Sequence, residues 1–421
     1  MSEWRELVMG ELVASGLAEI RTGPFGTQLR ASDYTAEGVP VINVRNLGFG
    51  SVRRASLERV DVKVQKRLAG HLLEHGDIVF GRKGAVDRHV LVSSKESGWM
   101  QGSDCIRLRL LPGAPVGPRF LSKALVTPEH RSWMEAQCSH GATMASLNQE
   151  IVSRISLRVP PSSIQRRVVA VLAAFDELIE INERRIELLE DLARSLYREW
   201  FVRFRFPGHE CAAFVESKLG SIPEGWDACP LFDIADVGFG YSFKSARFSD
   251  AGPYPVVRIR DVLDGVTATF TDETADPRYA VYDGDVLVGM DGEFHLNQWS
   301  GGEAWLNQRV ARLRPITGLS PRHLMLATAA PIRAWNDSIV GTTVAHLGKR
   351  HLETIQILVP PGGLLQKVTT AFDALAGEQL LLVSQNRRLA ATRDLLLPRL
   401  VTGRLDISDI DLGDLLPEEI A

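Results

Sequence analysis

Few side chains in this sequence have the type and spacing that catalysis requires. Glu216 and Lys218 match the E-x-K spacing of a nuclease, but they lie in a polar segment after Pro207 without a suitable preceding aspartate. His71 and His75 are four residues apart, yet no H-E-x-x-H motif accompanies them to hold zinc. Neither pair therefore identifies a catalytic or metal centre.

Motifs that bind phosphates or activate a nucleophile are absent as well. The sequence has no G-x-x-x-x-G-K-[ST], G-x-G-x-x-G or G-x-S-x-G motif, and no N-P-P-[YF] tetrapeptide of the kind that holds a flipped adenine. Gly238 and Gly240 form an isolated G-x-G, which we interpret as a turn. We therefore predict a chain that is not an enzyme, binds no metal and carries no cofactor of its own.

Length and composition are those of a multidomain globular protein. At 421 residues we expect two or three domains, and 45% hydrophobic and 24% charged residues are ordinary values. No apolar run approaches the ~18–20 residues that a membrane helix needs, and the N-terminus lacks the apolar core of a signal peptide. Four widely spaced cysteines fit a reducing compartment. These features predict a cytoplasmic protein.

The charge is mildly acidic overall but unevenly distributed. A net charge of −4 and a pI near 6.2 count against a freestanding nucleic-acid-binding domain, which is usually basic. However, the last 16 residues hold six acids and no base, while segments 52–67 and 81–88 are rich in Arg and Lys. A nucleic-acid partner would have to meet a local positive field, or one supplied partly by other subunits.

The chain contains an internal duplication. Residues 141–161 and 341–361 align without a gap at an offset of 200 and share eight identities in 21 positions. A unit of about 200 residues is too long for a solenoid repeat, so it is a duplicated domain followed by a duplicated helix. A duplicated binding domain with a fixed spacer suits a partner that is itself repetitive, such as duplex DNA.

Each duplicated domain is expected to be α+β, with a mixed or antiparallel sheet. Short β-branched segments bounded by Gly, Pro or Asp predict strands. They are VPVINV (39–44), DIVFG (77–81), CIRLRLL (105–111), YPVVRI (254–259), DVLVG (285–289) and VARLRPI (310–316). Polar loops and short helical pieces such as 118–138 separate them.

After each Pro-Pro pair the apolar spacing becomes helical, which predicts two long helices packed as an antiparallel coiled coil. The resulting division is 1–159 (first domain), 160–206 (central helix), 207–359 (second domain), 360–404 (C-terminal helix) and 405–421 (acidic tail). The predicted pairing seam consists of Phe175, Leu178, Asn182, Leu189, Leu192, Phe372, Leu375, Leu382, Asn386 and Leu389. About 30–40 helical residues span roughly 45–60 Å, so the helices are either a ruler between two binding domains or an ordinary two-helix core.

The order of domain, long helix, domain, long helix and acidic tail resembles the DNA specificity subunit of type I restriction-modification systems. Short strings add to the resemblance: GPFG at 23–26, ASDY at 31–34, GVPVI at 38–42, GSDCIR at 102–107, GDVLVGMDGEFH at 284–295, LNQRV at 306–310 and LLPRLV at 396–401. The resemblance implies two target-recognition domains, a bipartite double-stranded DNA target, and no catalysis by this chain. It also implies two methyltransferase subunits that use S-adenosylmethionine, and restriction subunits that use ATP and Mg²⁺.

Base recognition needs polar and basic side chains on exposed loops. In the first domain the candidates are Arg82, Lys83, Arg88, Ser139, His140, Thr143 and Asn148. In the second domain they are Lys244, Arg247, Arg260, His295, Asn297, Gln298, Thr342, Lys349 and Arg350. Each could instead be a solvated charge or a phosphate contact, which positions the protein without reading sequence.

Two other classes of protein were weighed. A scaffold that joins two partner subunits without sequence-specific DNA binding explains the helices and the acidity, but not two divergent sets of polar loops. A fused restriction-methylation enzyme would need a methyltransferase or nuclease motif. A subunit of a system that only methylates remains open.

Overall fold

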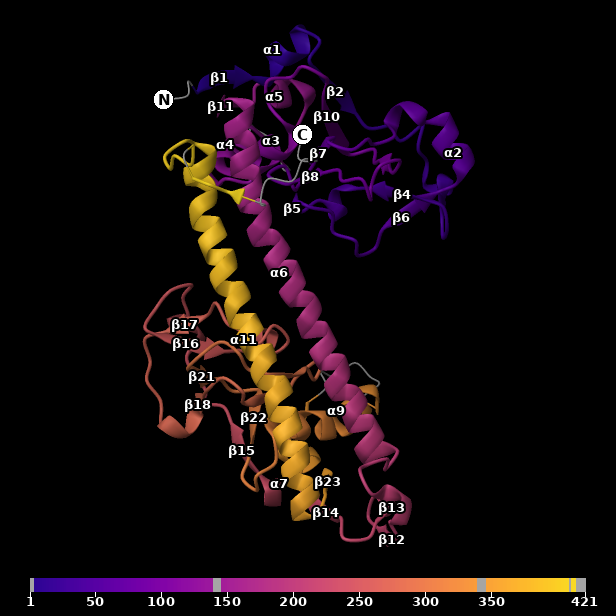
Figure 1. Cartoon of the computed structure of the whole chain (residues 1–421), viewed down its shortest axis with the longest axis vertical. Helices are drawn as coiled ribbons and strands as arrows, with labels where there is room; N and C mark the ends of the chain where they lie inside the picture. Colours follow the sequence, from indigo (N-terminus) through magenta and orange to yellow (C-terminus); the bar gives the residue numbers. More distant parts are fainter. Residues whose placement is uncertain (1–3, 139–144, 339–345, 409, 414–421) are drawn as a thin grey trace. The chain divides into compact units, whose positions relative to one another are not determined.

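The structure is a computed structural model that describes residues 4–138, 145–338, 346–408 and 410–413. The chain forms two compact units, Met1–Leu178 with Leu389–Ala421, and Ile179–Arg388. Each unit contains one α+β domain and one part of each long helix (Figure 1). The two units are therefore described separately.

The first domain is built on a five-stranded sheet in the order β2-β10-β7-β8-β5 and a four-stranded sheet in the order β3-β6-β4-β9. Both sheets are mixed, because β5 runs parallel to β8 and β4 runs parallel to β9. A separate ribbon pairs β1 with β11. The strands are β1 Arg5–Val8, β2 Ala18–Thr22, β3 Tyr34–Thr35, β4 Val39–Ile42, β5 Phe49–Gly50, β6 Glu58–Val60, β7 Ile78–Gly81, β8 His89–Leu91, β9 Met100–Gln101, β10 Cys105–Leu110 and β11 Ser156–Val159; the helices are α1 Met9–Ala14, α2 Val62–Arg67, α3 Pro118–Leu125, α4 Pro128–Cys138 and α5 Gln149–Ser153.

The second domain repeats this plan. Its sheets have the orders β15-β22-β19-β20 and β17-β16-β21-β18, and its ribbon pairs β14 with β23. A hairpin of β12 and β13 precedes it. The strands are β12 Phe214–Ser217, β13 Gly220–Pro223, β14 Asp227–Pro230, β15 Ala235–Phe239, β16 Tyr254–Val257, β17 Phe270–Thr271, β18 Ala280–Val281, β19 Val286–Gly289, β20 Leu296–Gln298, β21 Ala304–Leu306, β22 Val310–Pro315 and β23 Gln356–Val359; the helices are α7 Leu231–Ile234, α8 Ile259–Val262, α9 Pro321–Ser338 and α10 Lys349–Glu353.

Each of the six predicted strand segments contains a strand, although Val44 and Ile259 already belong to the helical turns that follow, and each domain is α+β as predicted. The central strands β7 and β19 are buried along their whole length, which is why their sequences are continuous apolar runs and not alternating ones.

The two domains also share an ion pair with a buried carboxylate at the same place in the sheet. In the first domain, Arg109 on β10 donates two hydrogen bonds of 2.7 Å to Asp77, just before β7. In the second domain, Arg314 on β22 donates bonds of 2.8 and 2.6 Å to Asp285, just before β19. Each carboxylate is buried and also accepts a backbone N–H. This repeated pair joins the two central strands of the sheet in both domains, β7 with β10 and β19 with β22.

The long helices are α6, Ser162–Tyr197, which continues as a π-helical turn over Arg198–Val202, and α11, Gly362–Val401. Within the second unit they run antiparallel, since Asn182 contacts Asn386 while Arg185, further along α6, contacts Glu378, earlier in α11. The Asn182 Nδ2 donates to Asn386 Oδ1 at 2.8 Å. A polar pair within an apolar seam can fix helix register at some cost in stability.

The predicted seam needs correction at two positions. Leu178 and Leu192 are 49% and 55% exposed, so they do not lie in the interface between the helices. The predicted seam residue Asn182 is buried, and Ala193, next to Leu192, is buried in place of Leu192. The reason is that α6 carries two adjacent apolar stripes with the same 3–4 spacing, and only one of them faces α11.

Among the residues that the structure describes, no helix is long and apolar enough to cross a membrane.

Candidate nucleic-acid interface

In each domain three chain segments meet where the central strands end. In the first domain they are the turn after β7, the turn before β10 and the segment before α5. The Arg82 N–H donates to the carbonyl of Asp104 at 2.8 Å, and the Leu147 N–H donates to the carbonyl of Arg82 at 2.8 Å. In the second domain the same two bonds join Met290 to Arg309 at 2.8 Å and Leu347 to Met290 at 2.7 Å.

These backbone bonds establish which residues correspond. The sheet register agrees, because Gly81 pairs with Cys105 where Gly289 pairs with Val310. Lys83 therefore corresponds to Asp291, and Asp104 corresponds to Arg309. Ser146 and His346 also correspond, since each forms an isolated β-bridge, to Lys83 and to Asp291 respectively. We call Lys83, Asp104 and Ser146 the first loop cluster, and Asp291, Arg309 and His346 the second loop cluster.

The two clusters carry the same ion pair with its signs reversed. In the first cluster the Lys83 Nζ lies 3.6 Å from Asp104 Oδ1, with both side chains about half exposed. In the second cluster the Arg309 Nε lies 3.3 Å from Asp291 Oδ2. The turn before β10 in the first domain thus presents the carboxylate of Asp104, and the corresponding turn before β22 in the second domain presents the guanidinium of Arg309.

The second cluster has a third polar member. The His346 Nδ1 lies 2.6 Å from Asp291 Oδ1 and 3.4 Å from a terminal nitrogen of Arg309. Because the contact to the carboxylate is much shorter, we place the Nδ1 proton on the side of Asp291. Asp291 therefore holds His346 with one oxygen and Arg309 with the other.

The backbone at Arg309 has φ 72°, in the left-handed region that favours glycine. For a residue with a long side chain this costs roughly 1–3 kcal/mol, and such residues concentrate at functional sites. The turn is held against Gly240, the residue directly after β15, because a Cβ atom on Gly240 would lie 1.9 Å from the carbonyl of Asn307. In the first domain, Gly23 stands equally close to the carbonyl of Gly102. The close approach accounts for Gly240 of the G-x-G motif.

An open pocket of about 480 Å³ lies beside the second cluster. It is lined by Arg258, Ile259, Arg260, Asp291, Glu293, His295, Asn307, Gln308 and Arg309. The Oδ1 of Asn307 is buried and has no hydrogen-bond partner among the described residues. The pocket thus combines guanidinium and amide donors with carboxylate and amide acceptors, the groups that read base edges.

The first-domain candidates differ in where the structure places them. Lys83 belongs to the first cluster, and Arg82 holds that cluster through its backbone. Arg88 lies with its guanidinium over the ring of Phe49 at 5.5 Å. Asn148 caps α5 by accepting the Ile151 N–H at 2.8 Å, a structural role that accounts for it without DNA. Three further candidates, Ser139, His140 and Thr143, lie outside the described residues.

In the second domain, Arg260 and His295 line the pocket. Lys244 is exposed, and Arg247 beside it forms an ion pair of 2.7 Å with Asp272. Lys349 and Arg350 are exposed at the start of α10, while Thr342 lies outside the described residues.

Two candidates in this domain are corrected. Gln298 is 7% exposed and donates to the carbonyl of Gly284, and Asn297 donates to the carbonyl of Leu263 at 2.7 Å. Both were predicted to lie on an exposed loop, but they belong to β20, and their side chains hydrogen-bond to the backbone of neighbouring turns.

Sequence reasoning missed Asp104 as a member of the first loop cluster, and Asp291, Arg309 and His346 as members of the second. The string LNQRV at 306–310 held a signal, because three polar residues in a row separate two apolar strands. The correspondence between Lys83 and Asp291 was hidden, because their charges are opposite and their offset differs from 200.

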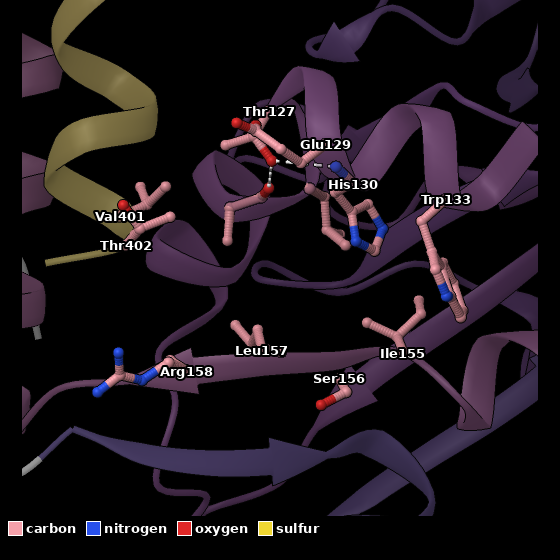
Figure 2. A pocket seen from close by; sticks show the side chains of 12 residues that line it. Thr127, Glu129, His130, Trp133, Ile155, Ser156, Leu157, Arg158, Val401 and Thr402 are labelled. Carbon is pink, nitrogen blue, oxygen red and sulfur yellow. Dashed lines mark hydrogen bonds between the residues drawn. The ribbon is translucent and has the colours of Figure 1, made fainter. Parts of the chain in front are cut away.

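A second hollow, of about 310 Å³, lies in the first unit (Figure 2). His130 and Trp133 of α4, Ile155 and Leu157 of β11, and Val401 at the end of α11 line it. Glu129 and Arg158 line it as well, but no residue of the first loop cluster does. In the second unit the residue that corresponds to Val401 is Phe201, which packs on His323 with ring centroids 4.3 Å apart.

Two buried histidines lie in the cores. Burial lowers the pKa of His89 to about 3, and its Nε2 lies 2.8 Å from the Ser122 hydroxyl. Burial also lowers the pKa of His323 to about 3. Both are neutral at physiological pH and serve packing. Among the described residues there is no cluster of three or more His, Cys, Asp or Glu that could hold a metal ion.

Comparison with known proteins defines the class of protein. The profile of the type I restriction modification DNA specificity domain matches residues 15–191 and 223–372, one match for each half of the duplication. The chain belongs to this family.

Individual relatives agree. The chain is 31% identical to the EcoBI specificity subunit of Escherichia coli, over 46% of this chain and 42% of that protein. It is 25% identical to the MjaIX specificity subunit of Methanocaldococcus jannaschii, over 65% of this chain and 66% of that protein. The matches thus span less than two thirds of the length of these two relatives. The crystal structure of a type I S subunit from M. genitalium has a similar fold, with a TM-score of 0.58 over 95% of this chain and 96% of that one, at 15% identity.

Proposed function

We propose that this chain is the DNA-recognition subunit of a type I restriction-modification complex. Each α+β domain reads one half of a bipartite target through its loop cluster and the residues around it. The observation that carries the proposal is that two domains of one topology present the same site with opposite charges. A single fold with two different polar surfaces suits two different half-sites, because each base pair displays its own donor and acceptor pattern in the major groove.

We further propose that the chain is not catalytic and works in the cytoplasm. Methylation and restriction would be carried out by two methyltransferase subunits and by restriction subunits, and S-adenosylmethionine, ATP and Mg²⁺ would be bound by these partners. The exposed face of α6 supports a helical partner. Ile181, Leu188 and Leu192 are 48%, 55% and 55% exposed, and their spacing of seven and four residues puts them on one face.

The test is a genome-wide map of methylated bases in cells with and without this chain. Loss of one bipartite motif on deletion is the expected result, and the motif would give both half-sites and the spacer. An unchanged map, with the partner methyltransferase expressed, would contradict the proposal and favour a scaffold that joins subunits without reading DNA.

A further inference from the structure

The second loop cluster differs from the first in how firmly its cation is held. Arg309 is fixed by a carboxylate on one side, by an uncommon backbone conformation beneath it, and by a turn that Gly240 allows to lie close. Its side chain is nevertheless 53% exposed. A long cation that is oriented at its base and open at its tip is arranged to bind something outside the domain.

We infer that Arg309 is a specificity-determining residue that reads a guanine in the half-site of the second domain, and that Asp291 and His346 are its positioning residues. The inference rests on the proposed function and deepens it. The Nε of Arg309 faces Asp291 at 3.3 Å, and one terminal nitrogen has only a long contact of 3.4 Å to His346 Nδ1, so the terminal nitrogens can still donate to a ligand. A planar pair of donors matches the N7 and O6 acceptors of guanine, which makes arginine with guanine the commonest specific contact in the major groove.

The pocket beside Arg309 carries charges of both signs. Asp291 and Glu293 line it together with Arg258 and Arg260. Asp291, 3.3 Å from the Arg309 Nε, neutralises part of the charge that would attract a phosphate, whereas a base edge presents both donors and acceptors to such a mixed site. We therefore assign Arg309 to reading sequence, and the salt dependence measured below separates this role from a phosphate contact.

The first domain presents the opposite group at the corresponding position. Asp104 is 51% exposed and offers only acceptor oxygens, with the Lys83 ammonium 3.6 Å away. A carboxylate there accepts from an exocyclic amino group, so the corresponding base in the first half-site is a cytosine or an adenine. One ion pair with reversed signs thus distinguishes the two half-sites.

The experiment compares variants of the full chain in complex with its methyltransferase partner, using a duplex DNA library with both half-sites randomised. Arg309→Gly removes the guanidinium and suits φ 72°, so the variant should fold at least as well as the parent. Arg309→Lys keeps the charge but loses the planar fork. The control is Lys218→Gly, which removes one positive charge from the β12–β13 turn of the same unit.

The expected result is a loss of preference at one position of one half-site. Both Arg309 variants should lose roughly 5- to 150-fold in preference for guanine there, while the other half-site and the Lys218→Gly variant stay as in the parent. Asp291→Asn should weaken the same preference by a smaller factor. A merely structural role for Asp291 would instead lower the melting temperature and the binding of every sequence alike.

Three outcomes would overturn the inference. An unchanged motif in Arg309→Gly would show that this residue does not read a base. An equal loss on all sequences, with the salt dependence reduced by about one unit of slope, would show a phosphate contact. A preference for a base other than guanine in the parent, lost on mutation, would show that the assigned base is wrong. If the parent complex selects no bipartite sequence at all, the proposed function itself fails, which is a different result from any of these.

Discussion

The two domains are alike where they are buried and unlike where they are open. The pair of Arg109 with Asp77 recurs as Arg314 with Asp285. By contrast, Lys83 with Asp104 recurs as Asp291 with Arg309, its signs reversed. The sheet and its internal ion pair set the position of the turns. The side chains on the turns can therefore differ in charge between the two domains without a change in the sheet. Duplication has thus produced one frame with two different surfaces.

The buried pair gives the largest expected effect. Asp77→Ala and Asp285→Ala should each destabilise their own unit by about 2–4 kcal/mol, because each removes the partner of a guanidinium and the acceptor of a backbone N–H. Urea unfolding followed by circular dichroism would measure the loss. If only one of the two substitutions lowered the free energy of unfolding, the two ion pairs would not contribute equally to stability, although their geometry is the same.

A buried difference between the domains should appear as pH sensitivity. His323 is the third residue of α9, where the third residue of α3 is Phe120. Burial lowers the pKa of His323 to about 3, against about 6.5 when unfolded, so the unfolded state binds the extra proton. The stability that this histidine contributes is full above pH 6.5 and is lost as the pH falls toward 3.

In the parent, the free energy of unfolding should fall between pH 6.5 and pH 5, and His323 should account for about 2 kcal/mol of this fall. The variant His323→Phe should lack this part of the fall. Urea midpoints at the two pH values would measure it, with His295→Phe as a partly exposed control. Equal pH dependence in the parent and in His323→Phe would show that the ring is not held neutral.

Exchanging the loop clusters tests the open surfaces directly. The double variant Lys83→Asp with Asp104→Arg should change one position of the first half-site by roughly 5- to 150-fold in preference and leave the second unchanged. Methylated-base maps would report it. The reciprocal double variant in the second domain is the matched control, and a change in both half-sites would show that the domains do not read independently.

The smallest effect is expected at the surface of the second domain. Lys349 forms an exposed pair with Glu353 one helical turn later in α10. Lys349→Ala should therefore cost no more than about 0.3–0.5 kcal/mol in thermal unfolding. A loss of several kcal/mol would show that the pair supports the neighbouring loop cluster.

The fold was predictable from the sequence because its signals are local or repeated. The strands at 78–81 and 286–289 are recognisable as short apolar runs. The two long helices are recognisable from apolar residues that recur every three or four positions. The same spacing wrongly placed Leu178 and Leu192 in the helix interface. When a helix has two apolar stripes, the sequence alone does not show which stripe packs against the neighbouring helix. The prediction that Gln298 lies on an exposed loop was wrong for a related reason, since the side chain of a polar residue in a short strand can point into the domain.

The site was predicted only in outline. Arg260 and His295 line the pocket, but the ion pairs that organise the clusters join segments far apart in the chain. Charge reversal also removes the similarity by which a repeat is recognised. Only three-dimensional correspondence, through the backbone bonds of Arg82 and Met290, shows that the two sites occupy one place.

The small ribbons of β1 with β11 and β14 with β23 have a genetic consequence. Each ribbon hydrogen-bonds the first strand of a domain to its last, so Arg5 lies opposite Val159 and Asp227 lies opposite Val359. A crossover in the gene at these two points would exchange a whole domain and leave both long helices intact. Recombination between related genes could thus supply a new half-site in a single event, without a series of compensating mutations.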